Sequence, residues 1–196
     1  MRDQPISAIL LAAGESRRMG SLKQLLAFRG KTFVETCVDN LLASEVTEVV
    51  VVTGYRDDEV KSAIGNRQVG YAHNENYRSG MASSIKCGIR AVSLDSKACV
   101  VSLVDQPQIG PDVINRVIEK YRSPSLIVIP TYDGKKGHPI LLDLNLKDEI
   151  LEMDDNEGLR QVVHAHQDKV SFVEVSSSAI LEDCDFPEDY KRLLKL

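Results

Sequence analysis

The chain has 196 residues, of which 43% are hydrophobic and 27% are charged, a composition typical of ordinary globular proteins. A chain of this length is expected to form one domain, so we predict a single domain over residues 1–196. Its net charge of −5 argues against nucleic acid as a main partner, because binding a polyanion requires a basic surface.

The cysteine pattern and the N-terminal segment indicate a cellular compartment. The four cysteines form neither a C-x-x-C pair nor a zinc-ligand spacing with histidine, so we expect reduced, mostly buried thiols. The apolar run at residues 6–13 is far shorter than the ~20 residues that cross a bilayer, and it lacks a signal peptide's cleavage region. We therefore expect a cytoplasmic protein with no membrane partner. The cysteines are Cys37, Cys87, Cys99 and Cys184.

Apolar runs and helical periodicity alternate along the first two thirds of the chain. Continuous apolar runs predict strands buried on both faces of a parallel sheet, and apolar residues at three- and four-residue steps predict helices. In chain order we expect strand 6–13, helix 33–42, strand 48–53, helix 57–64, strand 68–73, helix 81–91, strand 97–104, helix 111–122 and strand 125–130. This alternation predicts an α/β fold, a three-layer α/β/α sandwich with a mainly parallel sheet.

The C-terminal third is less regular. Residues 131–137 are predicted to form a turn between strands 126–130 and 139–142, as a hairpin on the edge of the sheet. Further on we expect helices at 148–153 and 157–165, a strand at 170–175 and a last helix at 188–194. The sequence contains no internal repeat, low-complexity tract or linker, which supports a single domain.

The strongest chemical signal is the segment LAAGESRRMGSLK at residues 11–23, directly after the first strand. Its small residues let the backbone approach a ligand closely, and successive N–H groups in such a turn can bind an anion. Ligands of doubly wound sheets bind just past the carboxyl ends of strands, where this segment lies. The alternative is a solvated basic loop. The residues concerned are Ala12, Ala13, Gly14, Arg17, Arg18 and Lys23.

Other polar residues stand at the ends of predicted elements. Asp105 ends a buried strand, where an unpaired charge costs several kcal/mol, so it either caps the next helix or binds a metal ion. Gly80, Ser83 and Ser84 lie at a predicted helix N-terminus, where they either cap the helix or hold an anion or a base edge. His138, within Gly-His-Pro, is by itself more often structural than catalytic.

Residues 11–23 match L-A-A-G-x-S-x-R-M-G-x-x-K, so the chain resembles the MobA-like NTP transferases, and within them the molybdenum cofactor cytidylyltransferase branch. Similar family motifs occur as NENYRSGMASSI at 74–85, DQP at 105–107, GHP at 137–139 and EDCDFPEDY at 182–190. Glu75, Ala82 and Phe186 depart from the usual pattern. The resemblance covers nearly the whole chain and implies a fold like that of the nucleotide-diphospho-sugar transferases.

The resemblance also implies a role for each matching residue. Nucleotide contacts are implied for Leu11, Ala12, Ala13, Gly14, Asn74, Gly80, Ser83 and Ser84. Arg18 and Lys23 would bind the triphosphate and act in catalysis. Asp105, also catalytic, would bind Mg²⁺ together with Asp185, although residues 182–190 alone are typical of a helix start. Acceptor contacts are implied for His138 and Arg160.

The implied reaction transfers CMP from CTP to molybdenum-bearing molybdopterin and releases pyrophosphate. Relatives that transfer a guanylyl group usually carry glycine where this chain has Ala13, which favours CTP. A molybdenum hydroxylase apoenzyme is implied as a partner. The alternatives are transfer from GTP or to a sugar phosphate, a non-catalytic cofactor-insertion chaperone, and an oxidoreductase on the same scaffold, although the chain has no NAD fingerprint.

Overall fold

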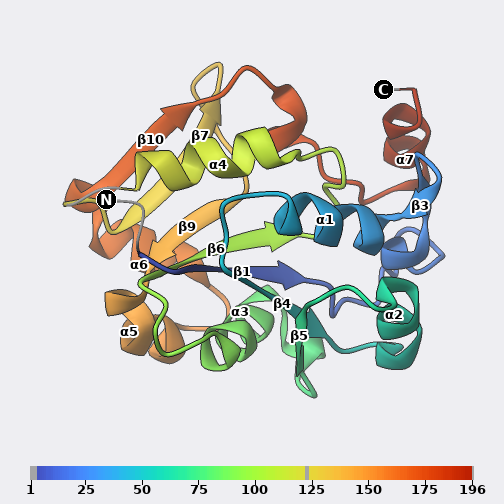
Figure 1. Ribbon diagram of the computed structural model, residues 1–196, viewed down its shortest axis with the longest axis horizontal. Coiled ribbons are helices and arrows are strands. Elements are labelled where there is room, and N and C mark those ends of the chain that lie inside the picture. The colour runs from blue at the N-terminus through green and yellow to red at the C-terminus, as the bar shows by residue number, and fades with distance from the viewer. Residues whose placement is uncertain (1–3, 122–123, 196) are drawn as a thin grey trace.

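The computed structural model describes residues 4–121 and 124–195. Within this part of the chain, an eight-stranded sheet has the strand order β10-β7-β9-β6-β1-β4-β5, with β8 paired to β7 (Figure 1). The strands of this sheet are β1 (Ile6–Leu11), β4 (Glu48–Thr53), β5 (Gly70–His73), β6 (Ala98–Leu103), β7 (Ile127–Tyr132), β8 (Lys135–Lys136), β9 (Ile140–Asp143) and β10 (Val170–Glu174). A separate hairpin joins β2 (Ala27–Phe28) and β3 (Lys31–Thr32).

Helices cover both faces of the sheet, with α1 and α4 on one side and α3 and α5 on the other (Figure 1). The helices are α1 (Phe33–Leu42), α2 (Asp57–Ile64), α3 (Met81–Ala91), α4 (Pro111–Lys120), α5 (Lys147–Glu152), α6 (Leu159–Ala165) and α7 (Pro187–Leu193). Short 3-10 turns include η1 (Lys23–Leu25) and η5 (Ser178–Leu181). The predicted three-layer α/β sandwich is confirmed.

The central strands are apolar on both faces because each face carries its own helix layer. In β1, Ala8 and Leu10 pack on the side of α1, α2 and α4, whereas Ile9 and Leu11 pack on the side of α3, α5 and α6. The neighbouring strands β4 and β6 both pair with β1 in parallel. The carboxyl ends of these three strands therefore meet at one edge, where the segments that follow them come together.

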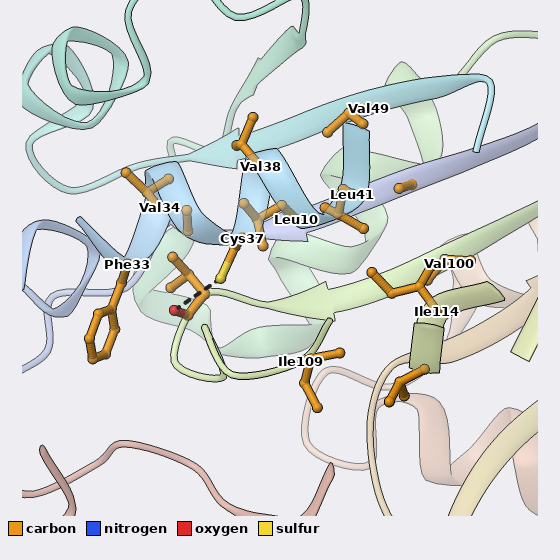
Figure 2. Close-up of a cluster of buried hydrophobic side chains, with 14 of the residues drawn as sticks. Leu10, Phe33, Val34, Cys37, Val38, Leu41, Val49, Val100, Ile109 and Ile114 are labelled. Atoms are coloured by element: carbon orange, nitrogen blue, oxygen red, sulfur yellow. Dashed lines mark hydrogen bonds between the residues drawn. The ribbon is translucent and has the colours of Figure 1, made fainter. Parts of the chain in front are cut away.

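Helix α1 shows how the sequence sets an element and its packing. Its start is a capping box: the hydroxyl of Thr32 accepts the N–H of Glu35 at 3.3 Å, and the Glu35 carboxylate accepts the N–H of Thr32 at 2.8 Å. Its buried side turns toward Leu10 and Val100 of the sheet (Figure 2). The buried residues on that side are Phe33, Val34, Cys37, Val38 and Leu41.

The prediction that strands 126–130 and 139–142 form a hairpin on the edge of the sheet is wrong. Strand β9 lies inside the sheet, antiparallel to both β6 and β7, and the two edges are β10 and β5. Its adjacent residues Leu141 and Leu142 are both fully buried, one in each helix layer, as an internal strand requires. The tight hairpin is instead formed by β7 and β8, with Thr131 opposite Lys136.

Smaller differences concern element ends. The helix expected at 111–122 has Lys120 as its last residue, and Arg122 lies outside the described residues. Helix α6 begins at Leu159 because Gly158, with φ of 59°, interrupts the chain before it. All four cysteines are free thiols, three of them buried. No helix in the described ranges has both the length and the apolar character needed to cross a membrane.

Helix α3 approaches the sheet closely at Gly88. A Cβ atom at this position would lie 2.5 Å from Cγ2 of Ile9 and 3.0 Å from Cγ2 of Val52, so the helix can rest on β1 and β4 only because the side chain is absent. The segment just before α3 also contacts the loop that follows β1, through the Arg78–Glu15 pair at 2.7 Å.

We expect Gly88→Ala to lower the free energy of unfolding by about 1–3 kcal/mol, because the added methyl overpacks the contact between α3 and the sheet. Urea unfolding measures this change. The matched control is Arg90→Ala, an exposed position on the same helix, which should change stability by no more than about 0.5 kcal/mol. Equal stability of Gly88→Ala and the unmodified protein would contradict the packing described here.

Candidate active site

A cavity of about 360 Å³ lies at the carboxyl ends of β1 and β6. The loop after β1 forms one wall, the segment after β6 another, and the start of α3 a third. Most of the residues predicted to bind nucleotide, triphosphate or metal line this one cavity. They are Leu11, Ala13, Gly14, Arg18, Lys23, Gly80, Ser84, Asp105 and Asp185.

The loop after β1 is held in place by Gln24, a residue that the sequence pattern did not single out. Its side chain is buried, with 1% exposed, and its Nε2 donates to the carbonyl oxygens of Ala12 at 2.8 Å and Gly14 at 2.9 Å. The N–H of Lys23 donates to the hydroxyl of Ser16 at 3.0 Å. These bonds satisfy loop carbonyls internally and fix the backbone on which Lys23 stands.

Asp105 and Asp185 meet at the ammonium group of Lys23. Lys23 Nζ donates to Asp105 Oδ2 at 2.8 Å and to Asp185 Oδ1 at 2.7 Å, and Arg18 lies 3.7 Å from the other oxygen of Asp185. Burial favours the neutral amine, but the two carboxylates outweigh it and raise the pKa of Lys23. The structure thus joins residues that are 82 and 162 positions apart in sequence.

The loop before α7 presents Asp185 to this cluster. The Asp189 carboxylate accepts the N–H of Asp185 at 3.0 Å and that of Phe186 at 2.8 Å, which caps α7 and orders the loop. The N–H of Cys184 donates to the carbonyl oxygen of Asp105 at 3.1 Å, so the two acidic segments are joined directly. The ring centre of Phe186 lies 5.8 Å from the Arg18 guanidinium carbon.

The acidic cluster has features that suit a divalent cation. Asp105 Oδ1 is buried and has no hydrogen-bond partner among the described residues. Asp183, also missed by the sequence analysis, accepts from Gln106 Nε2 at 2.8 Å; burial and the nearby charges of Asp105 and Asp185 raise its pKa. No group of three or more His, Cys, Asp or Glu in the described ranges is arranged as a full metal site. Two carboxylates nevertheless suit Mg²⁺, which takes its remaining ligands from waters and phosphates.

Three of the residues predicted to bind nucleotide do not line this cavity: Ala12, which is 1% exposed, Asn74 and Ser83. Asn74 is buried, and its Nδ2 donates to the hydroxyls of Ser83 at 2.9 Å and Ser84 at 3.0 Å. Ser83 in turn donates to the carbonyl oxygen of Gly80 at 2.8 Å. Gly80 and Ser84 line the cavity, whereas Asn74 and Ser83 line a separate hollow. Ser83 and Asn74 therefore hold the turn before α3, and their contact with a nucleotide remains a prediction.

A close contact shapes the end of the cavity near Ala13. A Cβ atom on Gly54 would lie 2.9 Å from the Ala13 carbonyl oxygen, 2.9 Å from Tyr77 Cβ and 3.0 Å from Ala13 Cβ. Gly54 follows β4, and the sequence analysis did not select it. Its missing side chain lets Ala13 and Tyr77 come together at the cavity wall.

A second, larger cavity of about 980 Å³ contains the two residues predicted to contact the acceptor, His138 and Arg160. Met81, at the start of α3, lines both cavities, so they are neighbours. Burial lowers the pKa of His138, although the charge of Asp105 opposes this shift, and the imidazole is therefore mainly neutral near pH 7. Gly137 is required beside it, because a Cβ there would lie 2.2 Å from the Ile180 carbonyl oxygen.

The lining of the second cavity combines apolar and cationic groups. Val101, Ile129 and Ile140 supply apolar surface from three neighbouring strands. Phe172 on β10 is 45% exposed, and the Lys136 ammonium lies 4.9 Å from the centre of its ring. An exposed aromatic ring with a nearby cation can stack on a flat anionic molecule. The sequence analysis assigned no role to Phe172.

The chain is similar to known proteins over nearly its whole length. The chain is 30% identical over 186 residues to the molybdenum cofactor cytidylyltransferase of Escherichia coli (strain K12), covering 94% of this chain and 93% of that protein. It is 29% identical over 198 residues to the nicotine blue oxidoreductase of Paenarthrobacter nicotinovorans, covering 96% of each.

Among solved structures, Rv0371c of Mycobacterium tuberculosis H37Rv is similar, with a TM-score of 0.88, 25% identity, and 98% of this chain and 99% of that one covered. A structure of Rv0371c in complex with manganese also shares the fold, with a TM-score of 0.83, 24% identity and coverage of 98% and 99%. Residues 8–170 match the model of the MobA-like NTP transferase domain. The chain therefore belongs to the MobA-like NTP transferase family and is a nucleotidyltransferase.

Proposed function

We propose that this protein is a cytoplasmic enzyme that transfers CMP from CTP to a phosphorylated, molybdenum-bearing pterin and releases pyrophosphate. The observation that carries the proposal is the shared Asp105–Lys23–Asp185 cluster in a cavity that adjoins a larger one. The similarity to a molybdenum cofactor cytidylyltransferase over nearly the whole chain supports the choice of acceptor. A molybdenum hydroxylase apoenzyme is the proposed recipient of the product.

The residues of the first cavity suit in-line phosphoryl chemistry. An acceptor phosphate oxygen attacks the α-phosphorus of CTP, a new P–O bond forms, and the bond to the pyrophosphate oxygen breaks. Arg18, Lys23 and the loop N–H groups lie where they can neutralise triphosphate charge. The acceptor phosphate is already ionised at neutral pH, so no general base or covalent enzyme intermediate is needed. Mg²⁺ held by Asp105 and Asp185 would supply further charge neutralisation at the phosphates.

The choice of CTP rests on Ala13. Its side chain lies in the cavity wall beside Gly54 and Tyr77, where a methyl group leaves less room than a glycine would. Family members that transfer guanylyl groups usually have glycine here. The smaller space beside Ala13 therefore favours cytosine over the larger guanine. A single methyl discriminates by about 1–3 kcal/mol at most, so GTP is the competing donor.

The choice of a pterin acceptor rests on the second cavity. Its apolar surface, the exposed Phe172 ring and the cations Lys136 and Arg160 match a flat ring that carries a phosphate. A sugar phosphate, which is the competing acceptor, would leave much of this apolar surface uncovered.

We expect pyrophosphate release with Mg²⁺ to require both CTP and molybdenum-loaded molybdopterin, with GTP, ATP and UTP much less effective. Asp105→Asn should lower kcat by about 100-fold or more, because it removes a charge from the proposed metal site. The control is Asp95→Asn, an exposed carboxylate just before β6 at the opposite end of the sheet. If folded protein releases no pyrophosphate with any nucleotide, the proposed acceptor is wrong. Full activity of Asp105→Asn would show that the proposed metal site is wrong.

Gln24→Leu should raise the KM for CTP by about tenfold, equivalent to ~1.4 kcal/mol, because the loop that binds the triphosphate loses its internal donor. Steady-state kinetics at saturating acceptor give this number. Gln68→Leu, at an exposed position, is the control and should leave the KM unchanged. An unaltered KM in Gln24→Leu would show that the loop needs no such support.

Arg160→Ala should raise the KM for the acceptor about tenfold while leaving the KM for CTP unchanged, because Arg160 lines only the second cavity. Phe172→Leu should act in the same direction by removing the ring. Arg116→Ala, exposed on α4, is the control. A rise in the KM for CTP instead of the acceptor would contradict the division between the two cavities.

A further inference from the structure

We infer that Lys23 closes the metal site until nucleotide arrives: its ammonium group takes the place of the cation between Asp105 and Asp185, and it leaves only when a triphosphate offers it other partners. The inference rests on the proposed function in one respect, since it takes these two carboxylates as the metal ligands. It concerns the order in which metal and nucleotide bind, which the proposed function leaves open.

The first support is the geometry of the ion cluster. One ammonium group lies within 2.8 Å of an oxygen from each carboxylate, and the Lys23 side chain is only 14% exposed. Asp105 is 18% exposed, and its second oxygen is buried without a hydrogen-bond partner in the described part of the chain. Lys23 therefore satisfies part of the acceptor capacity of the cluster and leaves the rest for a stronger cation.

The second support is the local charge. Asp105 and Asp185 both contact the Lys23 ammonium, and a third carboxyl group, that of Asp183, lies beside them and accepts from Gln106 Nε2 at 2.8 Å. Arg18 and Lys23 are the basic residues in contact with this cluster within the described residues. The two carboxylates would attract a free divalent cation, so a lysine between them counteracts that attraction.

The third support is that the loop backbone around Lys23 is held by hydrogen bonds while its side chain borders the cavity. Gln24 and Ser16 fix the backbone around Lys23, while Lys23 itself lines the cavity of about 360 Å³. A triphosphate in that cavity carries several negative charges and would attract the ammonium away from the carboxylates. The metal ion would then enter with the nucleotide, and Lys23 would pass from carboxylate to phosphate partners.

The test measures binding of Mn²⁺ alone, a spectroscopically visible substitute for Mg²⁺, to purified protein by electron paramagnetic resonance. We expect Lys23→Met to bind Mn²⁺ at least about tenfold more tightly than the unmodified protein, because the competing ammonium is gone. Lys31→Met is the matched control: it also removes a lysine paired with an aspartate, Asp39, but Lys31 does not line the cavity, and the change should not alter the affinity. Equal or weaker Mn²⁺ binding by Lys23→Met would overturn the inference.

A second readout locates the effect and covers loss of stability. Lys23→Met should melt at a lower temperature than the unmodified protein without metal, and Mn²⁺ should raise its melting temperature by more. Adding Asp105→Asn to Lys23→Met should abolish the gain in Mn²⁺ affinity; a gain that persists would overturn the inference. Absence of pyrophosphate release in every assay would defeat the proposed function and leave the Mn²⁺ result to stand or fall separately.

Discussion

The meeting of two carboxylates at one lysine is the constraint on which the site depends. The carboxylates of Asp105 and Asp185 lie near one another in a partly buried place, which is unfavourable without positive charge close by. Lys23 supplies that charge in the protein described here. The loops after β1 and β6 and before α7 converge to bring these groups together.

The convergence follows from the topology. β1 and β6 are neighbouring parallel strands, and the N–H of Val104 still donates to the carbonyl oxygen of Leu11 at 3.3 Å beyond the last paired residues. The two loops therefore leave the sheet side by side. The α7 loop reaches the same place from the other end of the chain, and the bond from Cys184 to Asp105 joins it to the segment after β6. Rigid strands thus position side chains that stand on loops.

The sequence predicted the layers and most elements. A strand buried on both faces appears as a continuous apolar run, and a helix buried on one side has apolar residues at three- and four-residue steps. The place of β9 could not be read in the same way, because Leu141 and Leu142 show that the strand is buried but not which strands it joins. At the site, the family resemblance predicted that Lys23 binds the triphosphate and that Asp105 and Asp185 bind the metal ion. Gln24 and Gly54 escaped notice because their roles depend on carbonyls and side chains that only the fold brings near.

The central claim is that Asp105 and Asp185 hold the catalytic metal beside the triphosphate. A crystal structure with Mn²⁺ and a non-hydrolysable CTP analogue, with the metal located by anomalous scattering, tests it most directly. We expect the metal to coordinate both carboxylates and a phosphate oxygen, with the Lys23 ammonium moved onto the phosphates. A metal bound elsewhere, or a nucleotide outside the loop of residues 12–23, would contradict the account.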